Sequence, residues 1–250
     1  MDTITPEGGF RSQIEKEIGK RLEKTFNGNP DTVEVKLDNF TKYIKRQKLT
    51  RMLSLYEIFK KILTVKGSIV ECGVYKGFGL MAWANMSAVL EPANLMRKIY
   101  GFDTFEGFPQ VSEKDSNAVM KPECGQLHAN SYEELNELIK IYDDNRFLGH
   151  VNKVQVIKGG VEKTIPDFVS DNKHLIVSLL FLDLDLYEPT KVAIKNFYPR
   201  MPKGAIIAFD ELDNPIWPGE TMALLEECGI NRLKIERFEF DPYIGYAVID

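Results

Sequence analysis

The sequence has little cysteine and little histidine, with three of each in 250 residues. The cysteines Cys72, Cys124 and Cys228 lie far apart, which excludes a disulfide framework and a cysteine-rich zinc motif. Such sparse cysteine is typical of a reducing compartment, so we expect a cytoplasmic protein. The first ten residues, MDTITPEGGF, also lack the basic start and the apolar stretch of a signal peptide.

Long hydrophobic runs and an excess of basic charge are lacking as well. The most apolar segment, 175–181, is far shorter than the roughly 20 residues that cross a bilayer, so we expect no membrane partner. Lys and Arg number 32 and Asp and Glu number 37, a net charge of −5 that gives no reason to expect nucleic acid. Apolar residues interrupt the basic segment 42–51, which we interpret as a solvated helix face.

What the sequence does contain is a regular alternation of strand and helix patterns after a charged, helical segment, 1–66. The alternation predicts an α/β fold with a doubly wound, mainly parallel sheet, whose last two strands pair antiparallel at one edge. We therefore expect a helical amino-terminal extension at 1–66 and one α/β domain at 67–250. Strands are expected at 68–72, 98–103, 154–157, 175–183, 205–209, 233–238 and 245–249, and helices at 78–90, from 131, at 161–169, 189–198 and 220–228.

A glycine turn, ECGVYKG at 71–77, follows the first strand, at the edge of the sheet where ligands of such folds bind. Gly73 lets the backbone approach a ligand closely, and the start of the following helix offers free amides. The turn lacks the spacing of a dinucleotide-binding motif. Asp103 ends the second strand, 30 residues after Gly73, where its carboxylate can accept both ribose hydroxyls of an adenosyl group. Together they predict a site for S-adenosylmethionine.

The third strand end completes the predicted cofactor site. Gly159 and Gly160 permit an adenine ring to lie against the backbone, with Glu162 or a main-chain amide at its edge, although a tight turn explains these glycines equally well. Ser131 is expected to cap the helix that it starts, in a capping box with Glu134. The residues expected at the cofactor are Glu71, Cys72, Gly73, Tyr75, Gly77, Asp103, Thr104, Ser131, Gly159, Val161 and Asp183.

Acidic residues follow two strands that are expected to be neighbours, Asp183 and Asp185 after one and Asp210 and Glu211 after the next. Because adjacent strands lie about 4.8 Å apart, Asp183, Asp210 and Glu211 are expected to bind a hard cation such as Mg²⁺. The cation would lower the pKa of a substrate hydroxyl, and Asp185 or Asp183 would take its proton. Alternatively, some of these acids cap helices or pair with basic residues.

A long loop at 104–130 is expected to cover this edge of the sheet, where substrate contacts tend to lie. It carries His128, which we take as a further candidate catalytic residue that contacts the substrate or acts as a base. A surface histidine without a role is the alternative.

Three motifs carry a family resemblance: VECGVYKG at 70–77, GFDTFEGFP at 101–109 and LDLDLYEPT at 182–190. From about residue 40 to 219 the sequence resembles the macrocin and mycinamicin O-methyltransferases (TylF/MycF type). The stretch AFDELDNPIWPGE at 208–220 resembles the branch that methylates deoxysugars in enediyne biosynthesis. The resemblance implies a class I methyltransferase fold, S-adenosylmethionine, a divalent metal that is usually Mg²⁺, and a sugar hydroxyl as acceptor.

The same resemblance implies roles for individual residues. Glu71, Gly73 and Asp103 would hold the cofactor, and Asp183 with the pair 210–211 would hold the metal. The family commonly has two aspartates at that pair, so Glu211 is a departure whose longer side chain changes the ligand geometry. The family also forms homo-oligomers in which amino-terminal helices cover neighbouring sites, and the segment 46–56 resembles that lid.

We therefore expect a Mg²⁺-assisted methyltransferase that acts on a nucleotide-linked deoxysugar or a glycosylated natural product. Two other interpretations stay open. Asp183 and Asp185 also form a D-x-D motif, which could serve a metal-dependent glycosyltransferase. A protein that binds S-adenosylmethionine without catalysing a reaction is the other.

Overall fold

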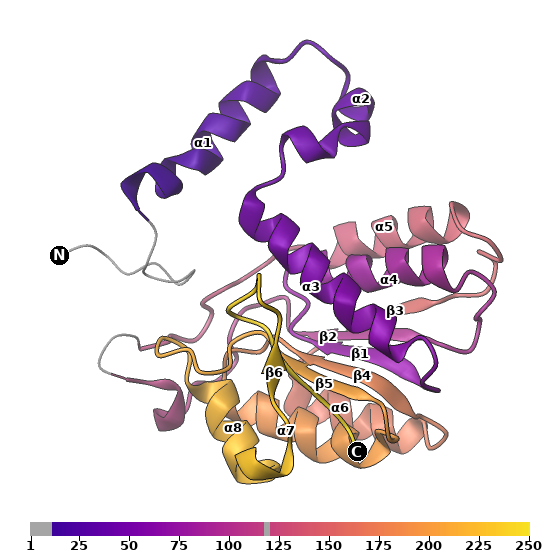
Figure 1. Ribbon diagram of the computed structural model, residues 1–250, viewed down its shortest axis with the longest axis vertical. Helices are drawn as coiled ribbons and strands as arrows, with labels where there is room; N and C mark the ends of the chain where they lie inside the picture. Colours follow the sequence, from indigo (N-terminus) through magenta and orange to yellow (C-terminus); the bar gives the residue numbers. More distant parts are fainter. Residues whose placement is uncertain (1–11, 118–120) are drawn as a thin grey trace. The chain divides into compact units, whose positions relative to one another are not determined.

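The computed structural model describes residues 12–117 and 121–250, which form two compact units that divide at Leu53 (Figure 1). The division falls inside helix α3 (Arg46–Ile62), earlier than the 66/67 boundary expected from the sequence. The part of α3 that belongs to the second unit buries Leu55, Ile58 and Phe59 completely, so it is a core helix of that unit.

The first unit is helical, as the charge and apolar pattern predicts. It contains α1 (Gln13–Gly28), α2 (Val33–Asp38) and the 3-10 helix η1 (Phe40–Lys42). A capping box between Ser12 and Glu15 starts α1. The ring of Phe26 packs edge-on against Tyr43 with ring centroids 4.9 Å apart, which joins α1 to the residues after η1.

The second unit contains, among the described residues, a seven-stranded sheet in the order β3-β2-β1-β4-β5-β7-β6. β1 pairs in parallel with β2 and β4, and β7 pairs antiparallel with both β5 and β6. The predicted α/β fold with an antiparallel edge is therefore confirmed. The strands are β1 (Ser68–Cys72), β2 (Ile99–Asp103), β3 (Val154–Lys158), β4 (Val177–Leu182), β5 (Ile206–Phe209), β6 (Glu236–Arg237) and β7 (Gly245–Val248).

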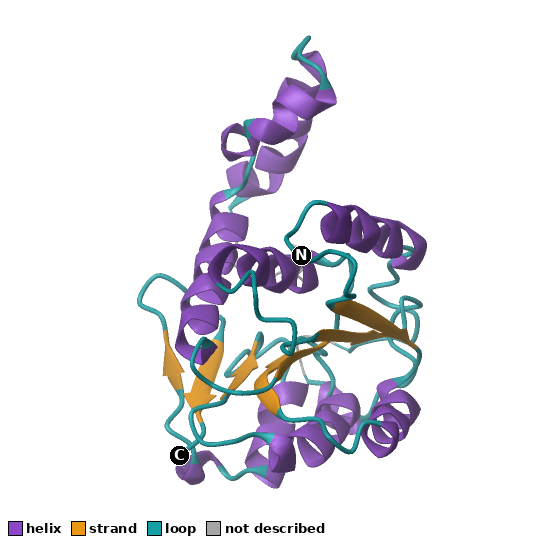
Figure 2. Ribbon diagram, turned by 90° about the vertical axis from the view of Figure 1, so that its right-hand side faces the viewer, coloured by secondary structure: helices purple, strands orange, loops and turns teal. Residues whose placement is uncertain are grey.

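Helices cover both faces of this sheet (Figures 1 and 2). One face carries α4, α5 and the end of α3 from Ser54, and the other carries α6, α7 and α8. The helices are α4 (Phe78–Leu90), α5 (Tyr132–Asp144), α6 (Val161–Asp171), α7 (Tyr187–Phe197) and α8 (Gly219–Glu227), with short 3-10 helices at Glu113–Asp115 (η2), Tyr198–Arg200 (η3) and Ile230–Arg232 (η4).

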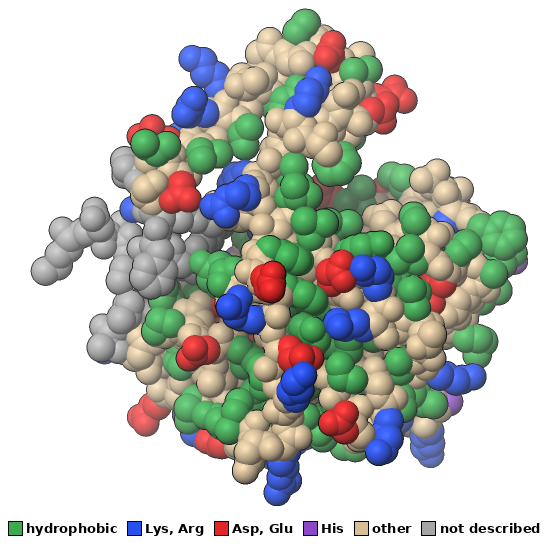
Figure 3. Space-filling view, viewed as in Figure 1, with side chains coloured by type: hydrophobic (Ala, Val, Ile, Leu, Met, Phe, Trp, Pro, Cys, Tyr) green, Lys and Arg blue, Asp and Glu red, His purple; other side chains and the backbone are tan. Residues whose placement is uncertain are grey.

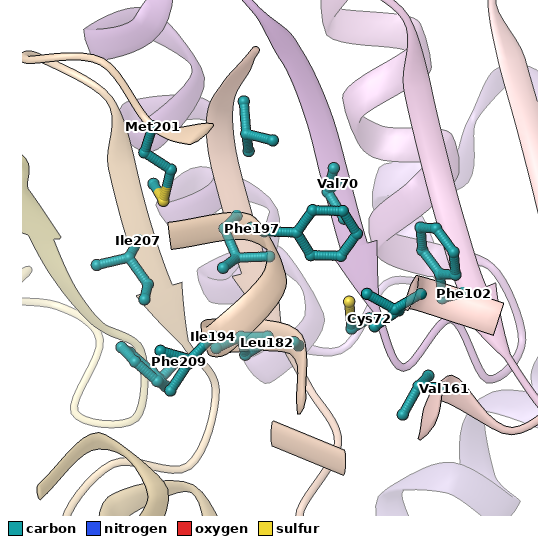
Figure 4. Packing of buried hydrophobic residues seen from close by; sticks show 14 of the residues in the cluster. Val70, Cys72, Phe102, Val161, Leu182, Ile194, Phe197, Met201, Ile207 and Phe209 are labelled. Atoms are coloured by element: carbon teal, nitrogen blue, oxygen red, sulfur yellow. The ribbon is translucent and has the colours of Figure 1, made fainter. Parts of the chain in front are cut away.

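One large hydrophobic cluster lies between the sheet and α6, α7 and α8. Val70, Leu182 and Phe209 of the central strands belong to one buried cluster with Ile194 and Phe197 of α7 (Figure 4). Every residue of β1, β4 and β5 is buried, which is typical of the central strands of a parallel sheet covered on both faces. This burial holds the strand ends, and the side chains that follow them, in place.

The surface is mixed in character. Figure 3 shows acidic, basic and apolar side chains interspersed on the face that it draws. None of the helices in residues 12–117 and 121–250 has both the length and the apolar character needed to cross a membrane.

Candidate active site

The strand order reverses between β1 and β4, and ligands of open α/β sheets bind beyond the carboxyl ends at this point. Gly73 follows β1 with φ of 92°, in the left-handed region that favours glycine. A Cβ atom on Gly73 would lie 1.7 Å from the carbonyl oxygen of Asp183. The glycine is therefore required because the ends of β1 and β4 touch there, in addition to any approach to a ligand.

The glycine turn is held by hydrogen bonds from two other parts of the chain. Asp103 Oδ2 accepts the Tyr75 N–H at 2.7 Å, and Asp103 Oδ1 accepts the Phe105 N–H at 2.6 Å. Ser131 Oγ donates to the Tyr75 carbonyl at 2.6 Å. Tyr75 has φ of 52°, so these bonds hold a left-handed, non-glycine residue. Both ends of the long loop thus meet at one residue of the turn.

The capping box predicted for Ser131 and Glu134 is wrong. Ser131 precedes α5, but its side chain makes no cap hydrogen bond to the helix. The hydroxyl instead donates to the Tyr75 carbonyl, and the side chain does not adopt the conformation that a capping box requires. The residue lies beside the turn where the sequence predicted a cofactor contact, and that role stays a prediction.

Glu71 is almost completely buried, with 1% of its surface exposed. A Cβ on Gly79 would lie 2.5 Å from Glu71 Oε1, so the carboxylate packs directly against the first turn of α4. Free amides and the helix dipole stabilise negative charge at such a position. Glu71 therefore supports the start of α4 next to the turn.

The structure places the other predicted cofactor residues in two groups. The side chains of Cys72 and Val161 lie in the hydrophobic core (Figure 4), so these side chains are not available to a ligand. Burial raises the pKa of the Cys72 thiol well above its usual range. Gly77, Thr104 and Gly159 lie in the turns at the strand ends: Gly77 precedes α4 with φ of 85°, Thr104 Oγ1 donates to the Gly107 carbonyl, and the Gly159 N–H donates to the Asp103 carbonyl.

The predicted acidic residues lie at the neighbouring ends of β4 and β5. Leu182 pairs with Phe209, so Asp183 and Asp210 each follow directly after a paired residue. Asp185, two residues further on, has a left-handed backbone with φ of 60°. A left-handed aspartate held by surrounding structure is a feature that clusters at functional sites.

A buried carboxyl group that the sequence analysis missed, Glu220, holds these strand ends. Its Oε1 accepts the N–H groups of Leu184 at 2.9 Å and Asp185 at 3.3 Å, and its Oε2 accepts the Glu211 N–H at 3.1 Å. Burial raises the pKa of Glu220 well above its usual range, and the negative charges of Asp185, Asp183 and Asp210 raise it further. The four acids therefore form one electrostatic cluster. The signal available in the sequence was an acid at the first position of the predicted helix 220–228.

The donor chemistry of this cluster fits a hard cation, because carboxylate oxygens are the ligands that Mg²⁺ prefers. The described residues nevertheless contain no group of three or more His, Cys, Asp or Glu side chains placed to hold a metal. Glu211 Oε2 accepts a hydrogen bond from Asn214 Nδ2 within its own loop. The set Asp183, Asp210 and Glu211 therefore stays a prediction.

The long loop is anchored over the ends of β4 and β5. Asp115, 2% exposed, accepts the Tyr187 N–H with Oδ1 at 2.5 Å and the Ser112 N–H with Oδ2 at 2.7 Å. Asn117 Nδ2 donates to the Pro215 carbonyl at 2.7 Å. A separate apolar cluster joins the same segments and comprises Phe108, Leu186, Ile216 and Trp217. Neither anchor was found by sequence reasoning.

His128 lies on this loop and is exposed. The structure shows no hydrogen bond between His128 and another described residue, so its proposed role stays a prediction. Residues 118–120, which belong to the predicted loop, lie outside the described residues.

The sheet order, the glycine turn and the strand-end acids together define the class I methyltransferase fold. The solved O-methyltransferase NovP has the same fold, with a TM-score of 0.61 at 20% identity over 80% of this chain and 79% of that one. A sequence model of the macrocin O-methyltransferase family (TylF) matches residues 43–224. The chain belongs to this family. That assignment supports S-adenosylmethionine as the cofactor of the site.

Two solved structures of CalS11 resemble the chain over nearly its whole length. One, described as a calicheamicin methyltransferase, is 34% identical, with a TM-score of 0.91 over 95% of this chain and 93% of that one. The other, an apo structure described as a TDP-rhamnose 3'-O-methyltransferase, is 32% identical, with a TM-score of 0.83 over 95% of each chain.

The curated relatives match a shorter part. A Streptomyces olivaceus enzyme, named as a 4'-O-methyltransferase of a dimethoxy-rhamnosyl tetracenomycin, is 29% identical over 59% of this chain. A Streptomyces niveus demethyldecarbamoylnovobiocin O-methyltransferase is 27% identical over 59% of it. The chain spans about half the length of the curated relatives it matches, 53% in both cases.

Proposed function

We propose that this protein transfers a methyl group from S-adenosylmethionine to a hydroxyl of a sugar, in a nucleotide-linked deoxysugar or a glycosylated natural product. The observation that carries the proposal is the junction of β1 and β4, where Gly73 meets the Asp183 carbonyl. This contact joins the turn held by Asp103 to the acidic cluster at Asp183, Asp185 and Asp210. The names of the relatives support methylation of a sugar hydroxyl.

When bound, the cofactor would supply an electrophilic methyl group for the acceptor oxygen, and its sulfur would keep the electron pair of the broken bond. Asp103 and Ser131 hold the turn on which the cofactor would lie. The carboxylate of Asp185 or Asp183 would accept the hydroxyl proton. Fixed positions for both reactants raise the rate by proximity, because the two groups no longer have to find each other.

We also propose that Mg²⁺ assists, held by Asp183 and Asp210 with Glu211 as a third ligand if its side chain leaves Asn214. Such an ion would lower the pKa of the acceptor hydroxyl. Support comes from the carboxylate donors and their position at adjacent strand ends. The assembly we propose is a cytoplasmic homo-oligomer, an inference that rests on the family resemblance and on three free cysteines.

Methyl transfer onto a panel of nucleotide-linked deoxysugars and glycosylated natural products tests the activity. We expect transfer to at least one sugar hydroxyl, with loss of most activity in Asp185→Asn or Asp183→Asn. Tight calorimetric binding of S-adenosylhomocysteine together with no methyl transfer would favour the non-catalytic binding protein. A protein that binds nucleoside diphosphates but does not bind S-adenosylhomocysteine would favour the glycosyltransferase.

Chelation tests the metal separately. We expect EDTA to abolish transfer and added Mg²⁺ to restore it, and Asp210→Ala to weaken the response to Mg²⁺. Full activity both in EDTA and in Asp210→Ala would contradict the proposed role of Mg²⁺ and would leave the proposed methyltransferase activity unaffected.

A further inference from the structure

The connection between β6 and β7, residues 238–244, lies at the same edge of the sheet as the candidate active site. β7 runs antiparallel to β5, and Gly245 at its start pairs with Phe209 at the end of β5. A Cβ on Gly245 would lie 2.9 Å from Leu212, which follows the acidic pair after β5. The end of this segment therefore lies beside Asp210 and Glu211.

The segment has a defined conformation because a buried carboxylate holds it. Asp241 is 3% exposed, and its Oδ1 accepts the N–H groups of Tyr243 at 2.9 Å and Ile244 at 3.4 Å. Its Oδ2 accepts the hydroxyl of Ser54 in α3 at 2.5 Å. Such bonds within the segment and to a core helix fix the direction of the side chains that it carries.

Those side chains form a stack of aromatic rings. The ring of Phe238 stacks on Phe240 with centroids 5.6 Å apart and planes inclined by 11°. It also stacks on Tyr246 at 5.0 Å and 22°. Tyr246 is 5% exposed and has Lys61 Nζ over its ring at 5.5 Å, so this end of the stack is covered.

The other end is open. Phe240 is 49% exposed and Tyr243, three residues later, is 48% exposed. Two large aromatic side chains are therefore exposed to solvent within one short segment. Ring stacking and the hydrogen bonds of Asp241 already hold the backbone of this segment. A flat ring placed against Phe240 would remove apolar surface from water and require little reordering of the protein.

We propose that residues 238–244 form a binding site for a planar aromatic ring of the acceptor substrate, which stacks on Phe240 while the attached sugar reaches the acidic cluster. The proposal rests on the proposed function, since it assigns part of the same substrate. A nucleobase of a nucleotide-linked sugar and an aromatic aglycone share this chemistry. Base–aromatic stacking tolerates different rings, because each offers a flat π-face.

Calorimetry with two ring-bearing probes tests the site. The probes are thymidine diphosphate and 4-nitrophenyl rhamnoside, with inorganic pyrophosphate and rhamnose as their counterparts without an aromatic ring. In Phe240→Ala we expect binding of at least one ring-bearing probe to weaken by about 10-fold, the scale of losing one stacked ring. Phe240→Tyr should restore it, and affinity for S-adenosylhomocysteine should not change.

A matched control removes an exposed phenyl ring elsewhere. Phe147 is 64% exposed and lies between α5 and β3, at the amino edge of the sheet, so Phe147→Ala should bind both probes like the wild type. If Phe240→Ala binds only thymidine diphosphate more weakly, the ring that stacks on Phe240 is a nucleobase. If it binds only the nitrophenyl glycoside more weakly, the ring is that of an aglycone. Both outcomes support the site.

The proposal is overturned if the wild type binds neither ring-bearing probe, or if Phe240→Ala binds both as well as the wild type does. It is also overturned if Phe240→Ala loses as much affinity for the counterparts without an aromatic ring as it does for the aromatic probes. Failure of the proposed function looks different, because the wild type would then bind no S-adenosylhomocysteine and transfer no methyl group, whatever the two ring-bearing probes do.

Discussion

Asp103 has both carboxylate oxygens engaged by backbone amides, those of Tyr75 and Phe105. Each oxygen can accept more than one hydrogen bond, so the carboxylate can hold the turn and still accept ribose hydroxyls. Loss of affinity in a variant of this residue could therefore arise from the lost ribose contact or from a displaced turn.

We predict that Asp103→Ala weakens binding of S-adenosylhomocysteine by about 1–3 kcal/mol, the scale for leaving buried polar partners unpaired. Calorimetry measures this affinity. Ser131→Ala is the matched control, because it removes the other bond to Tyr75 and keeps the carboxylate. It should have the smaller effect. Equal losses in the two variants would assign the effect to the turn and contradict the ribose role.

Lys153 is buried at the opposite edge of the sheet, where its Nζ donates to the Asn94 carbonyl at 2.5 Å. Burial lowers its pKa from 10.5 to about 8, opposed by Glu91 and assisted by the positive charges of Arg146, Arg97 and Lys98. Between these two pH values the unfolded chain keeps a proton that the folded protein has lost. The free energy of unfolding should therefore rise with pH in this window.

Urea unfolding between pH 8 and 9.5, below the range where most tyrosines ionise, measures this slope. We predict a more positive slope for the wild type than for Lys153→Met, in which the titrating group is absent. Identical slopes would show that Lys153 keeps an ordinary pKa in the folded protein.

At the scale of elements, α7 begins without a cap of its own. Leu186 stands at the N-cap position and makes no side-chain cap hydrogen bond. The Tyr187 N–H is instead accepted by Asp115, which comes from the distant loop. A Cβ on Gly219 would lie 2.7 Å from Asp115 Oδ1 and 2.6 Å from the Asp185 carbonyl, so three segments meet without spare room. The loop therefore controls the start of α7 and the position of Asp185.

We predict that Asp115→Ala lowers the free energy of unfolding by about 1–2 kcal/mol, as the loss of an N-cap does. The same change should lower kcat for methyl transfer and leave affinity for S-adenosylhomocysteine unchanged, because the cofactor turn lies at β1 and β2. Ser112→Ala removes only the hydroxyl bond to the same carboxylate and should keep most of the wild-type kcat. If Asp115→Ala is less stable but keeps a normal kcat, Asp115 contributes to the stability of the fold and not to methyl transfer.

At the scale of the whole second unit, Arg97 ties together the carboxyl ends of α3 and α4 and the amino end of β1. It is 3% exposed and donates to the carbonyls of Ile62 at 2.9 Å, Val65 at 2.9 Å and Gly67 at 3.0 Å. It also forms an ion pair with Glu91, 2.9 Å from its Nε. The end of α3, the start of β1 and the end of α4 therefore depend on one guanidinium group.

We predict that Arg97→Met lowers the free energy of unfolding by about 3–5 kcal/mol, because it leaves Glu91 buried without its charge partner. Urea denaturation measures this change. Lys140→Met, which removes an exposed ion pair with Glu137, should change it by less than about 0.5 kcal/mol. A loss in Arg97→Met no larger than in this control would show that water already solvates Glu91.

Much of the fold was predictable because its signals are local. The predicted bounds of β1 and α4 agree with the structure, since a short apolar strand, two glycines and a helical repeat are written in neighbouring residues. The 66/67 boundary differs from the observed division because the burial of α3 depends on a sheet formed by later residues. The capping box predicted at Ser131 is wrong for a similar reason, since the side chain is oriented by a hydrogen bond to the Tyr75 carbonyl, 56 residues away.

The sequence by itself determined the family, the order of strands and helices, and the edge at which Asp103, Asp183 and Asp210 appear, because parallel strands place all their carboxyl ends together. Only the tertiary structure decided how these groups are held. Glu220 and Asp115 bind amides of segments 35 or more residues away, and Gly73 is required by the carbonyl of Asp183. Hydrogen bonds and close contacts of this kind depend on chain packing, which no local pattern in the sequence encodes.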